Sequence, residues 1–106
     1  MLYYFQSEVP SMNVAKLTDC LNYSNVFASE TRLKILCIIG KKKLAGLDIL
    51  KHMGIAQSAV SKHLILMVKA QILNAEEKGK WKYYSINTEV LKAAVKSFRL
   101  LNEVVK

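Results

Sequence analysis

The sequence predicts a mainly α-helical domain that carries one small β-hairpin. Apolar residues recur at helical spacing over most of the 106 residues. Between Ile72 and Ile86 the pattern changes to two short segments rich in aromatic and branched residues. The length suits a single domain with its own core. Because 52% of the residues are hydrophobic, a disordered chain is excluded.

The N-terminal part of the chain is expected to form two helices. Pro10 is suited to open the first, which should run to about Tyr23, because proline lacks an N–H that the first helical turn would leave unpaired. Ser24 and Asn25 can then break and recap the chain. The second helix is expected at about 27–39. It is apolar over much of its circumference, so it should be central to the core.

Two further helices, at about 45–52 and 57–69, are separated by Gly54. Glycine accepts a positive φ, which lets two helices cross at the steep angle of a helix-turn-helix. We expect Leu47 and Leu50 to point inward from the shorter helix. The longer helix has an apolar face made of Val60, Leu64 and Met67. Its outer face is small and polar near the N-terminus.

Residues 72–77 and 81–86 are expected to pair as a hairpin with Gly79 at the tip. A last helix should follow from about residue 88, and its apolar stripe is wider than one packing partner requires, which indicates an oligomer contact. The whole is predicted to be one winged helix-turn-helix domain, residues 1–106. Its parts are dimerisation helices at 1–24 and 88–106, the helix-turn-helix at 45–69 and the wing at 72–86.

Positive charge is concentrated in the middle of the chain. The formal net charge is +8, and the stretch from Arg32 to Lys82 alone holds 11 basic and 3 acidic residues. Such a concentration points to a polyanion, with nucleic acid the first candidate and a membrane surface the second. Basicity for solubility alone is the alternative. No apolar run approaches the ~18 residues of a membrane span, and no secretory signal is present, so we expect a cytoplasmic protein.

The polar face of the 57–69 helix and the basic hairpin are the candidate DNA-binding surfaces. Glutamine can read adenine, serine can pair with a base or a phosphate, and lysine can reach guanine or phosphate. Lysines on the hairpin suit contacts to the DNA backbone. The candidate residues are Gln57, Ser58, Ser61, Lys62, His63, Lys78, Lys80 and Lys82.

Three segments resemble motifs of ArsR-type (arsenic- and metal-responsive) repressors. The segment FASETRLKIL at 27–36 resembles the opening of the family's domain. The segment QSAVSKHL at 57–64 resembles its recognition helix, and GKWKYY at 79–84 resembles its wing. The resemblance covers about residues 24–87. It implies a cytoplasmic homodimer whose first and last helices pack across a two-fold axis. It also implies binding to an inverted-repeat operator, with the 57–69 helix in the major groove and the 78–82 wing on the backbone or minor groove.

The sequence departs from the family at its metal sites. The family's metal-sensing cysteines would fall at 44–48, where Ala45 and Leu47 stand instead, and without a thiolate there is no soft-metal site. The family's other zinc site needs histidines on the last helix, whereas this chain has only His52 and His63. We therefore expect no metal and no cofactor. The effector stays unknown.

Other departures concern single positions around the helix-turn-helix. Ala56 replaces the usual serine before the recognition helix, so a cap worth about 1 kcal/mol is lost or supplied otherwise. Leu50 stands where a smaller residue is typical, and Gln71 replaces a glycine at the helix exit. These substitutions affect the helix crossing and leave the motif intact.

The two cysteines allow two interpretations. Cys37 lies in an apolar run, where cysteine usually acts as a small buried hydrophobe. The alternative is a redox or reactive-sulfur switch, because some ArsR-like repressors carry a cysteine in this helix. Their partner cysteine usually lies on the last helix, so Cys20 would have to substitute for it.

Two functions from different classes remain open. The first is a homodimeric, sequence-specific DNA-binding regulator, with double-stranded DNA and a second copy of the chain as partners. The second is a winged-helix module that binds protein and no nucleic acid, which the apolar surplus of the last helix would serve. An enzyme is not expected, because the chain lacks paired carboxylates in a plausible cleft, a glycine-rich phosphate loop and a nucleophile with its base.

Overall fold

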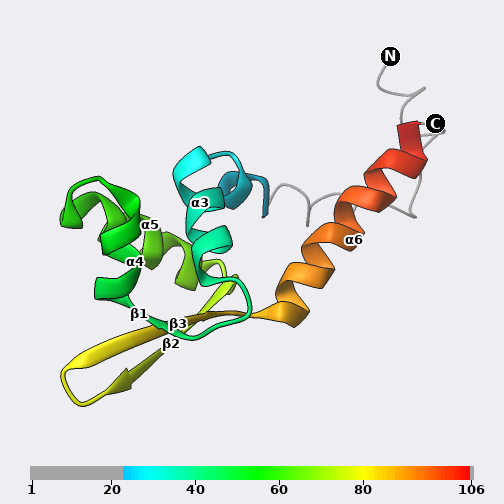
Figure 1. Ribbon diagram of the computed structural model, residues 1–106. Helices are drawn as coiled ribbons and strands as arrows, with labels where there is room; N and C mark the ends of the chain where they lie inside the picture. The colour runs from blue at the N-terminus through cyan, green and yellow to red at the C-terminus, as the bar shows by residue number, and fades with distance from the viewer. Residues whose placement is uncertain (1–22, 106) are drawn as a thin grey trace.

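A computed structural model gives the arrangement of residues 23–105 (Figure 1). The predicted first helix and Cys20 lie outside the described residues. The elements follow in the order α3 (Glu30–Ile39), β1 (Leu44–Ala45), α4 (Gly46–Met53), α5 (Gln57–Lys69), β2 (Leu73–Lys78), β3 (Trp81–Ile86) and α6 (Thr88–Val105). The prediction of a mainly helical domain with a hairpin wing is confirmed.

The break before α3 lies later than the sequence predicts. Residues 23–27 are helical, so the expected interruption at Ser24 and Asn25 is wrong. The chain bends at Ala28 instead, and Ser29 caps α3. The Ser29 hydroxyl accepts a hydrogen bond of 3.3 Å from the backbone N–H of Arg32. This bond pairs a backbone donor that the first helical turn leaves free, and it fixes the start of α3 at Glu30.

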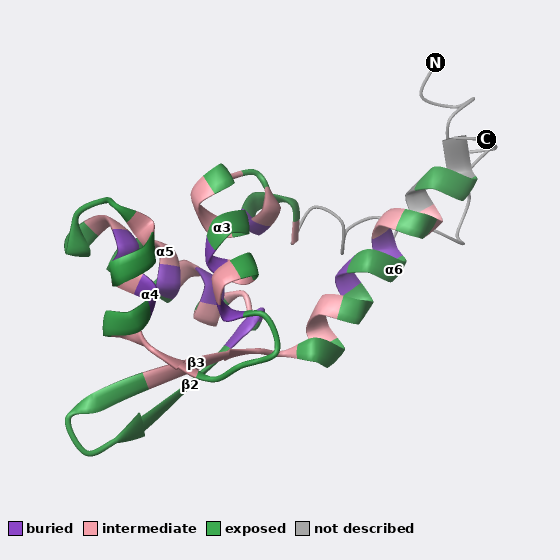
Figure 2. Ribbon diagram, in the orientation of Figure 1, coloured by how far each residue is buried: buried purple, intermediate pink, exposed green. Residues whose placement is uncertain are grey.

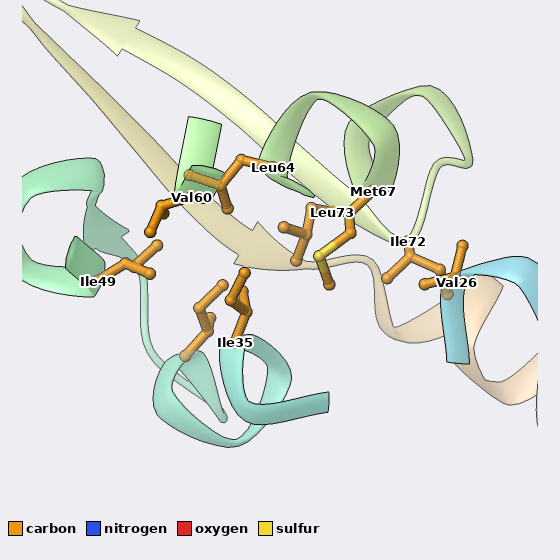
Figure 3. Close-up of a cluster of buried hydrophobic side chains, with 9 residues drawn as sticks. Val26, Ile35, Ile49, Val60, Leu64, Met67, Ile72 and Leu73 are labelled. Carbon is orange, nitrogen blue, oxygen red and sulfur yellow. The ribbon is translucent and has the colours of Figure 1, made fainter. Parts of the chain in front are cut away.

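One apolar cluster joins α3, α4, α5 and the start of the hairpin (Figure 3). Its side chains are at most 4% exposed. Fully burying each aliphatic side chain of this size contributes roughly 1.5–3 kcal/mol relative to exposure. The members are Val26, Ile35, Ile39, Ile49, Val60, Leu64, Met67, Ile72 and Leu73. Since α5 supplies three of them, the cluster fixes which face of α5 points to solvent.

The turn between α4 and α5 has the geometry that a helix-turn-helix needs. Gly54 ends α4 in the left-handed conformation, with φ 68° and ψ 18°. A residue with a side chain would have a strained backbone in this conformation, whereas glycine adopts it without strain. Ala56 precedes α5 and makes no capping hydrogen bond, as expected from the missing serine.

The sheet has three antiparallel strands in the order β1-β3-β2, one more than predicted. Strands β2 and β3 pair from Leu73 opposite Ile86 to Lys78 opposite Trp81. Gly79 has φ 62° while Lys80 has no positive φ, which is the pattern of a type II′ turn. The unpredicted β1 has only two residues, too few to show an alternating pattern, and it pairs with Tyr84 and Tyr83 of β3.

Helix α6 leaves the sheet and runs away from the other elements (Figure 1). It starts after Asn87, whose side-chain oxygen accepts from the backbone N–H of Val90 at 3.3 Å. Val90 and Leu91 pack against the apolar cluster. Further along, the Phe98 ring meets the Phe27 ring edge to face, with centroids 6.0 Å apart. The predicted role of α6 in a dimer stays a prediction.

Two expectations about burial are wrong. Cys37 is exposed rather than buried, because α3 turns Ile35 and Ile39 inward and Cys37 lies about 200° around the helix from each. In α4 the buried residue is Ile49, and Leu47 is 44% exposed. Figure 2 shows buried residues where α3, α4 and α5 meet the sheet and in the middle of α6, where Ala94 and Ser97 are buried, whereas the outer half of the wing is exposed.

Gln71 is a stabilisation target because its backbone is in an unfavourable conformation. It has φ 64°, and no other non-glycine residue in the described part of the chain has a positive φ. We expect Gln71→Gly to raise the free energy of unfolding by about 1 kcal/mol, because glycine avoids the clash between Cβ and the backbone. Chemical denaturation of both proteins measures the difference.

A matched control for this substitution lies two residues earlier. Lys69 ends α5 with ordinary helical geometry and is exposed. Lys69→Gly should lower the free energy of unfolding by roughly 0.5–1 kcal/mol, because glycine is a poor helix former. If both glycine substitutions changed the free energy of unfolding in the same direction, the interpretation that Gln71 has a strained backbone would be contradicted.

Candidate nucleic-acid interface

The exposed face of α5 carries most of the residues that the sequence singled out. Gln57, Ser58, Ser61 and Lys62 are all exposed. They form a face next to the one made by Val60, Leu64 and Met67, whose burial in the apolar cluster sets the rotation of the helix about its axis. Ile65, 57% exposed, continues the same face. The N-terminal half of α5 is therefore a small, polar surface that could enter a major groove.

A shallow groove of about 190 Å³ lies between α4, α5 and β3. It brings Gln57 and Ser61 of α5 together with Lys82 of the wing. Its apolar walls include Trp81, which is 47% exposed, and Leu47. Sequence reasoning missed Leu47, since helical spacing assigned it to the interior. The helix-turn-helix and the wing thus present one continuous surface.

Tyr84 forms part of the wall of this groove. Partial burial raises the pKa of its phenol above the usual 10.0. An ordinary tyrosine is already protonated at neutral pH, so the raised pKa leaves the Tyr84 phenol a potential hydrogen-bond donor there.

The lysines of the wing are not equivalent. Lys78 lies 4.0 Å from a carboxylate oxygen of Glu76, and Lys82 lies 3.8 Å from one of Glu77. Lys80, in the turn at the tip, has no ion pair within the described residues. The wing from 73 to 86 holds three lysines and two glutamates, a net charge of only +1. Lys80 is therefore the wing lysine whose charge is least offset by a neighbouring carboxylate.

The loop before β1 also pairs with the wing. Lys43 donates a hydrogen bond to the Glu76 carboxylate. This bond and the charge of Lys43, with a further contribution from Lys78, lower the pKa of Glu76 below the usual 4.5. Glu76 is consequently ionised at neutral pH, and it offsets part of the positive charge at the base of the wing.

His63 does not share the exposed face of α5. It lies two residues, about 200° of helical rotation, beyond Ser61. The structure brings it to α3 instead, where the Arg32 guanidinium nitrogen Nη1 is 3.1 Å from His63 Nδ1. Its expected contact with DNA stays a prediction that this position does not favour.

Among residues 23–105 no group of three or more histidine, cysteine, aspartate or glutamate side chains could hold a metal ion. No helix in that range is long and apolar enough to cross a membrane. Cys37 is exposed on α3, whereas the structure does not describe its proposed partner Cys20. The thiol pairing stays a prediction.

Taken together, the left-handed Gly54 turn between α4 and α5, the polar face of α5 and the basic tip of the wing define a winged helix-turn-helix protein of the DNA-binding kind. Residues 29–75 match the family described as bacterial regulatory protein, arsR family. The transcriptional repressor SdpR of Bacillus subtilis (strain 168) is 33% identical over 75 residues, which cover 68% of this chain and 83% of SdpR. The chain belongs to the ArsR family and is a DNA-binding transcriptional regulator.

Solved structures give the same assignment of fold. Reduced HlyU from Vibrio cholerae N16961 superposes with a TM-score of 0.65 at 25% identity, covering 78% of this chain and 88% of HlyU. An ArsR-like transcriptional regulator from Rhodococcus sp. RHA1 superposes with a TM-score of 0.69 at 19% identity, covering 86% and 83% of the two chains. The latter similarity supports the fold alone.

The positions of Gln57 and Lys80 predict two different losses on mutation. Gln57→Ala should lower affinity for a preferred sequence roughly fivefold to a hundredfold and leave random DNA unaffected, because a base contact is worth about 1–3 kcal/mol. Lys80→Ala should weaken binding to all DNA sequences alike. It should also reduce the slope of log affinity against log salt concentration by the amount that about one phosphate contact contributes. Titrations of labelled DNA at several salt concentrations separate the two. An equal loss on both kinds of DNA for Gln57→Ala would exclude base reading.

Proposed function

We propose that this protein is a homodimeric repressor that reads an inverted-repeat DNA operator with the N-terminal half of α5. The observation that carries the proposal is the arrangement of α5. Its apolar face is held in the core, and its face with Gln57, Ser58, Ser61 and Lys62 is exposed beside the wing. The wing and Lys80 would lie along the backbone or minor groove next to the helix.

The start of α5 supports binding to a phosphate as well as to bases. Ala56 offers no side-chain acceptor, and the first backbone hydrogen bonds of α5 are those of Ala59 and Val60 to the Ala56 carbonyl. The N–H groups of Gln57 and Ser58 therefore stay available at the positive end of the helix dipole. A DNA phosphate is a suitable acceptor at such a helix end.

A dimer would unite two such surfaces. Because α6 is apolar beyond what its own domain covers, with Val95 44% exposed, it supports a contact with a second copy. A two-fold axis would give two recognition helices one turn of DNA apart, about 34 Å, and a total charge of about +16. The protein would act without catalysis, and we place it in the cytoplasm with its DNA.

Repression rather than activation is supported by three relatives that are named repressors: SdpR and the arsenical resistance operon repressors of Staphylococcus aureus and Bacillus subtilis. HlyU of Vibrio cholerae, 26% identical over 68 residues, is named a transcriptional activator. A reporter gene placed behind the selected operator distinguishes the two, since a repressor lowers its expression.

Selection of bound sequences from a random DNA pool tests the reading of an operator. We expect an inverted repeat whose half-sites are centred about 10 base pairs apart, because one helical turn separates the two recognition helices. Affinity should fall steeply with salt concentration. No enrichment of any sequence, with affinity independent of salt, would contradict the proposal.

The mass of the full chain in solution tests the dimer. Light scattering should give about twice 12.0 kDa at micromolar concentration. A strict monomer that fails to bind DNA would favour the alternative of a module that binds protein, because the apolar stripe of α6 would then await a different partner.

A further inference from the structure

Arg32 on α3 makes three side-chain contacts with two other elements. Its Nε donates to the Val26 carbonyl at 3.0 Å, and Nη2 donates to the Asn25 carbonyl at 2.6 Å. Its Nη1 lies 3.1 Å from Nδ1 of His63 on α5. One guanidinium group therefore connects the helical segment 23–27 with the recognition helix.

The two carbonyls that Arg32 binds lie at the C-terminal end of the helical segment. Carbonyls there lack partners within the helix and carry the negative end of its dipole, so a cation is favoured. The planar guanidinium can donate in three directions at once. A lysine in this position would retain the charge and lose the fixed, forked geometry.

The contact with α5 fixes the protonation pattern of His63. Arginine can only donate, so Nδ1 of His63 must accept and its ring proton must lie on Nε2. No other side-chain hydrogen bond joins α5 to another element among the residues that the structure describes. Apolar burial otherwise holds α5 and sets which face is inside, and the contact between Arg32 and His63 adds a directional hydrogen bond to α3.

The same helical segment also contacts α6. Phe27, next to the two carbonyls, packs edge to face against Phe98 of α6. A continuous set of contacts thus runs from Phe98 through Phe27, the end of the segment and Arg32 to His63.

We propose that Arg32 is a positioning residue that orients α5 for sequence reading, and that His63 is its acceptor rather than a DNA contact. The link makes the orientation of the recognition helix depend on the segment 23–27, and through Phe27 on α6. This inference rests on the proposed function, since it assigns the residues that hold the reading helix in place.

Charge-conserving variants separate positioning from electrostatics. Arg32→Lys should lower the affinity for the selected operator about tenfold, because one charge-assisted hydrogen bond is worth roughly 1.4 kcal/mol or more. Binding to random DNA should change less than about twofold, since the net charge is preserved. Lys34→Arg, the reciprocal exchange at an exposed site on α3, should change neither.

The geometry of His63 supplies a second, independent pair of variants. Asparagine places an acceptor near the position of Nδ1, whereas glutamine places its amide near Nε2. His63→Asn should therefore keep most of the operator affinity, and His63→Gln should lose about tenfold, although glutamine is the better helix former. A higher operator affinity for His63→Gln than for His63→Asn would overturn the proposal. His52→Gln on α4 is the control, since His52 bonds only to the Asp48 carbonyl of its own helix.

A double-mutant cycle tests whether the two residues act through one contact. If they do, Arg32→Lys with His63→Gln should cost about tenfold, as each single change does, rather than the hundredfold product. A multiplicative loss, or equal losses on operator and random DNA, would overturn the role of Arg32. Failure of the wild-type protein to select any sequence would instead overturn the proposed function.

Nitrogen-15 spectra of the free, full-length protein, recorded at a pH high enough for its imidazole rings to be neutral, provide a test that needs no DNA. They should show the proton of His63 on Nε2, with Nδ1 unprotonated. A proton on Nδ1 would exclude the bond from Arg32 and overturn the proposal, even if the variants were too unstable for binding studies.

Discussion

Burial of one face of α5 is the constraint on which the rest of the structure depends. Val60, Leu64 and Met67 are at most 4% exposed and meet side chains of α3, α4 and the start of β2. With these three residues in the interior, the neighbouring face of α5 that carries Ser58, Lys62 and Ile65 is left in solvent, and Gln57 and Ser61 lie at the edge between the two faces, on the groove beside the wing. The exposed polar face is thus set by the packing of the core.

The sequence was sufficient to predict an element where residue spacing or a turn residue determines the local structure. The helix at 57–69, the positive φ of Gly54 and the hairpin with Gly79 at its tip were all predicted from spacing and residue type. Spacing failed for Leu47 and Cys37, because in helices with several apolar residues it does not say which of them the neighbouring elements cover. It also could not find β1, whose two residues depend on pairing with β3.

The candidate site shows the same difference between pattern and context. The exposed polar face of α5 follows from its periodicity. Composition, by contrast, gave equal weight to Lys78, Lys80 and Lys82, although only the structure shows Glu76 and Glu77 beside two of them. His63 was grouped with its sequence neighbours, and its contact with Arg32 joins residues 31 positions apart. Contacts of this kind depend on how the helices pack and have no local signal in the sequence.

Both ends of α5 are locally unfavourable, which explains why tertiary contacts matter so much to it. At the start, Ala56 provides no cap, which leaves a stabilisation of about 1 kcal/mol unused. Just past the end, Gln71 adopts a positive φ that glycine would accept more readily. The C-terminal end is nevertheless closed by backbone bonds from the Gln71 N–H to the Val68 carbonyl (2.9 Å) and from the Ile72 N–H to the Met67 carbonyl (3.1 Å), so it is the start of α5 that lacks a local cap. The position of α5 depends on its buried face, which resists translation and rotation, and on the directional bond from Arg32. A shift of α3 or of the segment 23–27 would therefore be passed to α5 through Arg32, which binds the Asn25 and Val26 carbonyls and lies 3.1 Å from His63.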